Sequence, residues 1–308
     1  MIKEDLQNRM DTLFPGVFNK VEKAENLNVL GNGGDNLWKT VSEKYISKVG
    51  KILAPISELT VDVYPDLEVR NQGASPTVQV EVIDSVGNAL YNTTNWDQSD
   101  ISNSYVDVKL DRISRPFYLT SYDLMHGERI ESKVGAAMEA VANGVFAKFI
   151  DKITSHAATL SQVADFGKFG PEEAVKISGA FGQSRETETL LLSPSLYSKI
   201  VPTNGLGLDP AVEGTYGINH IYKTAMENTG GSTVAAVALA KDAVVGAVGV
   251  QQSIIEQPGQ FVQDLGTIAG VPMTLIGHWS YEKQAMQMSV ETFAGFAVTS
   301  TDLVKYAC

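Results

Sequence analysis

Residues whose side chains commonly do chemistry are few in this chain and lie far apart. It has four histidines and one cysteine, and the cysteine, Cys308, is the last residue. The histidines stand at spacings that share no helical face, so each is interpreted as a packing or surface residue and not as a metal ligand or base. Cys308 is interpreted as an exposed or idle thiol. The histidines are His126, His156, His220 and His278.

The sequence motifs of several large enzyme classes are also missing. There is no Gly-x-Ser-x-Gly, no His-Glu-x-x-His and no Cys-x-x-Cys, and Gly167-Lys168 is followed by Phe169 where a phosphate-binding loop needs a hydroxyl. The acidic pairs Glu172-Glu173 and Asp97 with Asp100 lack the alternating oxygen ligands of a calcium loop and indicate solvated faces. We therefore expect no catalytic residue, no bound cofactor and no metal site, and no enzyme activity.

Two short stretches carry residues suited to contacts between subunits. An aromatic ring in a polar loop is costly to leave in water and fits a partner's pocket, although local packing is the alternative. An arginine fork suits a carboxylate on a neighbouring subunit, although a plain surface role is equally open. The intersubunit contact candidates are Trp96, Asn95, Asp97, Arg112 and Arg115.

The composition is that of a folded globular chain with an acidic charge balance. The 308 residues are 44% hydrophobic and 19% charged, and 24 lysines and arginines face 36 aspartates and glutamates, a net charge of -12. This balance disfavours free-standing DNA binding, which needs a basic face. The single cysteine excludes an intrachain disulfide and fits a reducing compartment. No apolar run of signal-peptide or membrane-spanning length is present, so we expect a soluble, non-secreted protein without a membrane partner.

The first 120 residues predict an arm followed by a hairpin. Helical stretches at 2–13 and 37–53, with sparse apolar positions, are typical of an arm that lies on a neighbour. Apolar residues then alternate at Val78, Val80 and Val82, and again at Val106, Val108 and Leu110, as in two strands of a hairpin. The long polar connection over 87–104 predicts that the hairpin projects.

A single long helix is predicted next. A cap at Thr120 or Ser121 opens an apolar stripe with a spacing of three or four residues that continues to about His156. Glycines at 127, 135 and 144 would lie within this helix, and we expect them to allow the close approach of another backbone. The stripe comprises Ile130, Val134, Ala137, Val141, Val145, Phe149 and Ile153.

The remainder predicts a compact α+β region and a final pair of strands. Helices are expected at 171–181 and 194–200, and a buried strand at 190–192. Further strands are expected at 233–239, 243–250 and 271–276. The segment 285–298 reads as two strands with a turn at Gly295.

Several segments resemble the major capsid protein of tailed bacteriophages (Caudoviricetes) with the Hong Kong 97-type fold. The stretch Ile113–Leu124 (ISRPFYLTSYDL) is similar to the family's passage from the extended loop into the spine helix. Leu190–Tyr197 (LLLSPSLY) is similar to the strand and helix of its axial domain. Ala238–Val244 (ALAKDAV) and Ile268–Pro272 (IAGVP) resemble its closing strands. The similarity of pattern spans about residues 40–308.

The resemblance implies an α+β Hong Kong 97-type capsid fold and a structural function. The chain would self-assemble into hexamers and pentamers of an icosahedral head that encloses double-stranded DNA without sequence recognition. A scaffolding protein, a portal and a cement protein are implied partners, and the virion, assembled in the host cytoplasm, is the implied location. The implied parts are an N-terminal arm (1–60), the extended loop with peripheral strands (61–120), the spine helix (121–157), the axial domain (158–283) and returning C-terminal strands (284–308).

Two other functions stay open at this point. A bacterial encapsulin shares the fold and encloses an enzyme cargo in place of DNA. A two-domain hydrolase would need converging titratable groups that the sequence does not show.

Overall fold

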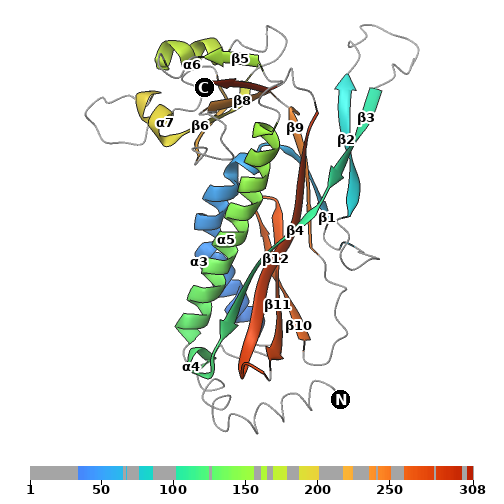
Figure 1. Cartoon of the computed structure of the whole chain (residues 1–308), viewed down its shortest axis with the longest axis vertical. Coiled ribbons are helices and arrows are strands. Elements are labelled where there is room, and N and C mark those ends of the chain that lie inside the picture. The colour runs from blue at the N-terminus through green and yellow to red at the C-terminus, as the bar shows by residue number, and fades with distance from the viewer. Residues whose placement is uncertain are drawn as a thin grey trace, which may run out of the picture.

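A long sheet is the element around which the rest of the chain is arranged (Figure 1). The computed structural model describes residues 34–64, 67, 76–85, 102–124, 127–155, 161–164, 169–178, 187–200, 218–224, 236–240, 242–250, 260–280, 282–299 and 304–307.

Six strands form this sheet. Their order is β1 (Thr60–Tyr64), β9 (Val244–Gly249), β12 (Ala285–Val298), β11 (Val271–Ser280) and β10 (Gln260–Ile268), and β4 (Asp111–Leu119) also pairs with β12. All pairs are antiparallel except β1 with β9. Phe293 and Ala294 of β12 pair with both β9 and β4, so these two strands flank β12 on opposite sides.

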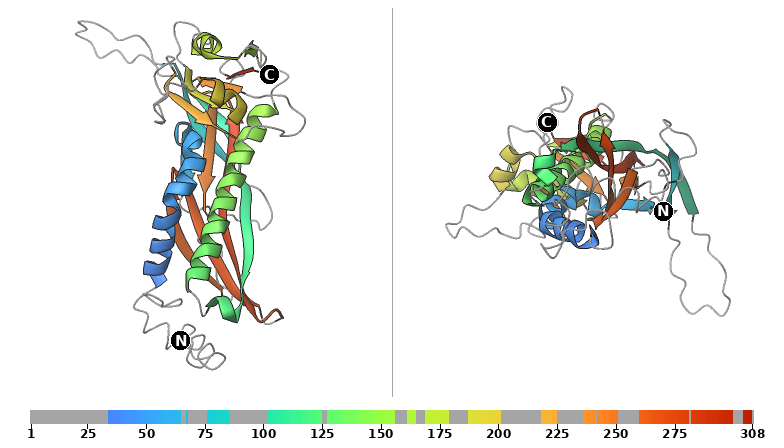
Figure 2. Two further views of the ribbon diagram at one scale, coloured as in Figure 1. Left: turned by 90° about the vertical axis from the view of Figure 1, so that its left-hand side faces the viewer. Right: turned by 90° about the horizontal axis from the view of Figure 1, so that it is seen from below.

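Two long helices cover one face of the sheet and lie side by side in Figure 2, left. They are α3 (Gly34–Ser57, 24 residues) and α5 (Gly127–Thr154, 28 residues). At ~1.5 Å rise per residue, α5 is about 42 Å long. All seven residues of the predicted stripe are at most 3% exposed and belong to the main core, which confirms that interpretation.

The predicted single helix is divided in two. A short helix, α4 (Ser121–Leu124), precedes α5, which begins at Gly127. Thr120 caps α4, because its hydroxyl accepts a hydrogen bond from the backbone N–H of Asp123. The predicted cap is therefore confirmed, but it opens a single turn and not the long helix.

The arm interpretation is wrong for the helix predicted at 37–53. This stretch lies within α3, and Val49, Leu53 and Ile56 are at most 1% exposed in the same core as α5. Their spacing of four and three residues makes one helical face, enough to bind α3 to its own chain. The helix predicted at 2–13 lies outside the described residues.

Two glycines of α5, Gly135 and Gly144, allow side chains of neighbouring elements to approach the helix closely. A Cβ placed on Gly135 would collide with the ring of Tyr45 from α3, and one on Gly144 would lie 2.8 Å from Cγ2 of Ile113 from β4. The prediction of an approaching backbone is therefore wrong at these two positions, where an aromatic ring and a branched aliphatic side chain approach the helix instead.

The opposite face of the sheet is covered in part by the base of a hairpin. Strands β2 (Thr77–Ser85) and β3 (Ser102–Lys109) pair in the predicted register, with Val80 opposite Val106. Their apolar face forms a second core with residues of β9 and β12, including Val245 and Phe293. The hairpin is therefore confirmed and its base is fixed to its own body. Of the connection predicted at 87–104, residues 102–104 belong to β3 and the rest lies outside the described residues, so its projection stays a prediction.

The predicted turn at Gly295 is wrong. Residues Ala285–Val298 form one continuous strand of 14 residues, with Gly295 inside it. A Cβ on Gly295 would collide with the backbone carbonyl of Lys109, where β3 crosses β12. Glycine inside a strand here marks a close backbone approach.

A second sheet lies at one end of the body, next to the C-terminal end of α5 (Figure 1). Its order is β5 (Ser161–Ala164), β13 (Val304–Ala307), β8 (Ala236–Ala240), β6 (Thr187–Leu192) and β7 (His220–Lys223). Helices α6 (Pro171–Ser178) and α7 (Pro194–Ile200) share a core with β6 and β8, as predicted for 171–181, 190–192 and 194–200.

The predicted axial boundaries of 158 and 283 do not follow the sheets. Strands β9, β10 and β11 fall within 158–283 but belong to the first sheet, and β13 falls within 284–308 but belongs to the second. A strand's own sequence does not say which sheet it joins. Antiparallel pairing of β10, β11 and β12 as neighbours in sequence decides it here.

Candidate assembly surface

Strand β4 carries both predicted arginines and forms one edge of the first sheet. It pairs with β12 from Asp111 to Leu119, and within the described residues no strand pairs with its other side. An open edge presents backbone N–H and C=O groups to which another chain can bond. The predicted contacts Trp96, Asn95 and Asp97 lie outside the described residues.

Two features block part of this edge. Pro116 has no N–H to offer, which is why proline in a sheet is confined to edges. The carbonyl of Tyr118 already accepts a hydrogen bond of 3.0 Å from Nζ of Lys133. The backbone groups that remain for a partner lie toward the Asp111 end of β4.

Arg112 binds a carboxylate of its own chain. Its Nε and Nη2 donate hydrogen bonds of 2.7 and 2.6 Å to the two carboxylate oxygens of Glu291 on β12. Glu291 is 4% exposed, and a buried carboxylate needs such a partner because burial disfavours its charge. The fork that was predicted to reach a neighbouring subunit is therefore engaged within the chain.

Arg115 points to the other face of β4. It pairs with Val290, whose side chain faces the helices, so Arg115 lies on the helix side of the edge. Its side chain is exposed, and no ion pair is recorded for it in the described part of the chain. On the same side, Lys148 of α5 forms an ion pair with Asp111. Arg115 is thus the arginine that remains available for a neighbouring carboxylate.

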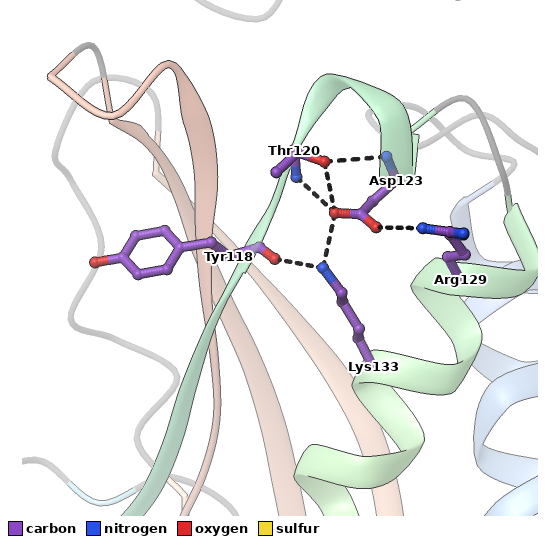
Figure 3. A network of polar contacts seen from close by, with 5 residues as sticks. All are labelled: Tyr118, Thr120, Asp123, Arg129 and Lys133. Atoms are coloured by element: carbon purple, nitrogen blue, oxygen red, sulfur yellow. Dashed lines mark hydrogen bonds and ion pairs between the residues drawn. The ribbon is translucent and has the colours of Figure 1, made fainter.

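A polar network closes the corner between β4 and α5 (Figure 3). Asp123 is 4% exposed, and its Oδ2 accepts hydrogen bonds from Lys133 Nζ at 2.7 Å and from the backbone N–H and hydroxyl of Thr120 at 2.9 and 2.7 Å. Arg129 Nη1 lies 3.9 Å from Oδ1 of Asp123. The Lys133 hydrogen bond, opposed by burial and assisted by Thr120, lowers the pKa of Asp123 to about 2.

Two exposed tyrosines flank this corner, each with a cation on its ring. Nζ of Lys283 lies 4.4 Å from the ring centre of Tyr118 and donates a 2.7 Å hydrogen bond to its hydroxyl. Cζ of Arg129 lies 4.6 Å from the ring centre of Tyr122, which is 55% exposed. This group was not predicted from the sequence, although Thr120 and Asp123 have the spacing of a helix cap.

The outer face of the hairpin adds a further exposed aromatic residue. Tyr105 of β3 is 63% exposed and lies opposite Glu81, next to a 3.2 Å hydrogen bond from Gln79 to Asp107. Because the inner face is buried against the body, this outer face is the one that a partner could contact.

The acidic residues and histidines do not converge in the described part of the chain. Glu173 is paired with Lys176 at 2.5 Å, and no described group of three or more histidine, cysteine, aspartate or glutamate residues is placed to hold a metal ion. No described helix combines the length and apolar character needed to cross a membrane.

Solved structures share this arrangement. The virus-like particle protein from Pyrococcus furiosus matches with a TM-score of 0.51 and 13% identity, over 88% of this chain and 97% of that chain. The two proteins share a fold. A chain of the capsid of cyanophage P-SCSP1u matches with a TM-score of 0.45 and 13% identity, over 81% of this chain and 86% of that one. A chain from Mycobacterium phage Adephagia matches with a TM-score of 0.46 and 10% identity, over 83% and 89%.

At the level of sequence, no protein-family model and no curated protein matches the chain. The predicted α+β class is confirmed, and the predicted resemblance is supported at the level of the fold by the virus-like particle protein. The roles of the hairpin as an extended loop, of α5 as a spine helix and of the second sheet as part of an axial domain stay predictions.

Proposed function

We propose that this chain is a capsid protein that self-assembles into a closed shell. The observation that carries the proposal is the match to the Pyrococcus furiosus particle protein over nearly the whole of both chains, at 88% and 97%. A match over that share of both chains concerns the architecture of the whole chain and not one common motif.

The described surface supplies features that suit such assembly. The open side of β4 can accept backbone hydrogen bonds from a second copy, and Arg115 can bind a carboxylate there. The net charge of -12 keeps free subunits apart until such specific contacts form. Each contact is modest by itself, so a shell built from many of them assembles reversibly and cooperatively.

The finer form of the proposal is the head of a tailed bacteriophage. Hexamers and pentamers of the chain would form an icosahedral shell in the host cytoplasm around double-stranded DNA, with a scaffolding protein, a portal and possible cement subunits as partners. The protein would then act as a structural component of the virion and not as an enzyme.

An encapsulin-like compartment is the second candidate. The virus-like particle of Pyrococcus furiosus, an archaeon, is the neighbour with the TM-score of 0.51. In that case the shell would enclose a protein cargo in place of a genome.

Electron microscopy of the purified chain tests the shared proposal. Closed particles of uniform diameter are expected, and a monodisperse small oligomer under all conditions of salt and concentration would overturn it. Gene neighbours then separate the two forms: a portal and a terminase beside the gene indicate a phage, and a cargo enzyme indicates an encapsulin.

The polar loop with its single tryptophan provides a variant test. Trp96→Ala should leave the subunit folded and impair particle formation, because an aromatic anchor would be lost from the partner's pocket. Normal particles from the Trp96 variant, counted by microscopy against the wild type, would show that the loop does not carry the contact.

A further inference from the structure

The two sheets meet through a shared apolar core. Leu191 of β6 with Val237 and Leu239 of β8 lie in the same buried cluster as Phe149 and Ile153 of α5. Residues of the second sheet therefore pack against the end of α5, and the packing of this junction sets how the two sheets are oriented relative to each other.

A polar group lies at the rim of this junction. Glu58, between α3 and β1, accepts a 3.0 Å hydrogen bond from the hydroxyl of Tyr222 on β7. Nε2 of His220, on the same strand, lies 3.3 Å from the other carboxylate oxygen of Glu58. The His220 and Tyr222 rings are stacked, with centroids 6.2 Å apart and planes 15° apart. One carboxylate of the body thus holds two side chains of the second sheet.

Among the described residues, the charged groups near His220 are few. Lys223 alternates with Tyr222 along β7 and so faces the other side of the sheet. Asp242, near the start of β1, accepts a 2.6 Å hydrogen bond from Thr60. From α3, the nearest polar contact of Glu58 is the Ser57 hydroxyl at 3.4 Å. In the described part of the chain, Glu58 is the one charged group paired with His220.

The strand next to His220 carries a polar group without a partner. Thr189 of β6 pairs in register with His220 and is 1% exposed, and its hydroxyl has no hydrogen-bond partner among the described residues. A buried hydroxyl left unpaired disfavours the closed arrangement by roughly 1–3 kcal/mol. The junction is therefore a place where local opening is comparatively easy.

We propose that Glu58 and His220 form a proton-operated latch between the two sheets. The ion pair exists only while the imidazole carries its second proton, which histidines gain within the range of pH 8 to 5. The Tyr222 hydrogen bond to Glu58 does not require that proton and holds in both states. The latch therefore adds to the closure of the junction at mildly acidic pH, and this contribution is lost as the pH rises and the imidazole becomes neutral.

The consequence for a particle rests on the proposed function. In a shell, a tighter junction at low pH would restrict how the two sheets of a subunit can be oriented relative to each other. The latch itself is a property of the folded chain and does not require assembly.

Hydrogen exchange measured by mass spectrometry on the full chain tests the latch. After correction for the intrinsic pH dependence of exchange, amides of β6 and β7 should exchange about twofold to fivefold more slowly at pH 5.5 than at pH 7.5, the effect of a partly exposed ion pair. His220→Gln should abolish this difference, and Glu58→Gln should abolish it as well.

Two controls separate the latch from a merely structural contact. Tyr222→Phe should speed exchange by a similar factor at both pH values, because it removes a bond that is present in both. His278→Gln, on the exposed part of β11, should leave the pH difference intact. Exchange in α5 reports whether each variant is folded. A pH difference that persists in folded His220→Gln would overturn the latch, whether or not particles form.

Discussion

Replacing Asp123 by asparagine should destabilise the chain in a manner that depends on pH. Asp123 has a pKa of about 2 in the folded chain against an ordinary value of 3.8, and its side chain is buried. This difference in pKa between the folded and the unfolded chain corresponds to about 2 kcal/mol of stability at neutral pH. Asparagine retains the shape of the side chain and removes the charge that Lys133 and Thr120 stabilise.

The sign of the pH dependence follows from the lowered pKa. The contribution of a carboxylate with a depressed folded pKa is complete above its unfolded pKa, and it is lost as the pH falls through the folded value. The difference between wild type and Asp123→Asn should therefore be constant from pH 7 to pH 5. It should fall to roughly half by pH 3 and vanish below pH 2.

Guanidinium unfolding followed by circular dichroism measures this difference. Wild type and variant are compared at pH 7, 5 and 3 in the same assembly state, established by light scattering. Asp151→Asn makes the same chemical change on the exposed side of α5 and should stay within about 0.5 kcal/mol of wild type. Two results would refute the network as a source of stability. One is a loss of unfolding free energy at pH 7 no larger than that of Asp151→Asn, and the other is a loss that does not shrink at pH 3.

Three further substitutions test the packing of the body. Gly135→Ala should destabilise by about 1–3 kcal/mol, because its methyl group would collide with Tyr45 and push α3 from α5; unchanged thermal unfolding would contradict this contact. Val141→Pro should abolish folding, at ~3 kcal/mol or more, since it breaks the buried centre of α5; a soluble variant with native circular dichroism would oppose it. Arg112→Ala should cost about 1–2 kcal/mol in denaturant unfolding by leaving the buried Glu291 unpaired, whereas an undiminished midpoint would mean that water replaces the arginine.

Local patterns were sufficient to predict the helices and the hairpin. The stripe of α5 and the alternation of β2 and β3 each arise from one buried face, and the period of that face is visible in the sequence. Pro194 and Pro171 marked the first residues of α7 and α6 because proline suits the first helical turn.

Pairings over long sequence distances could not be predicted in the same way. Glu291 stands 179 residues from Arg112, and nothing near either residue indicates the other. The membership of β9 to β11 in the first sheet is likewise decided by strand order, which the composition of a strand does not encode. The Asp123 network is intermediate, because its Thr120 cap is local while Lys133 lies one helix further on.

The burial of β12 explains why its sequence was wrongly predicted to form two strands. Its residues at 286, 288, 290, 294 and 296 face the helices, and those at 293 and 297 face the hairpin core. Apolar and polar residues alternate up to Glu291, but both faces are apolar in the second half of the strand and the alternation disappears there. Gly295 then looked like a turn, whereas it admits the backbone of Lys109. The same contact fixes the base of the hairpin against the centre of the sheet. Strand β12 therefore positions the paired strands β2 and β3 on the body, through a contact that neither segment reveals in its own sequence.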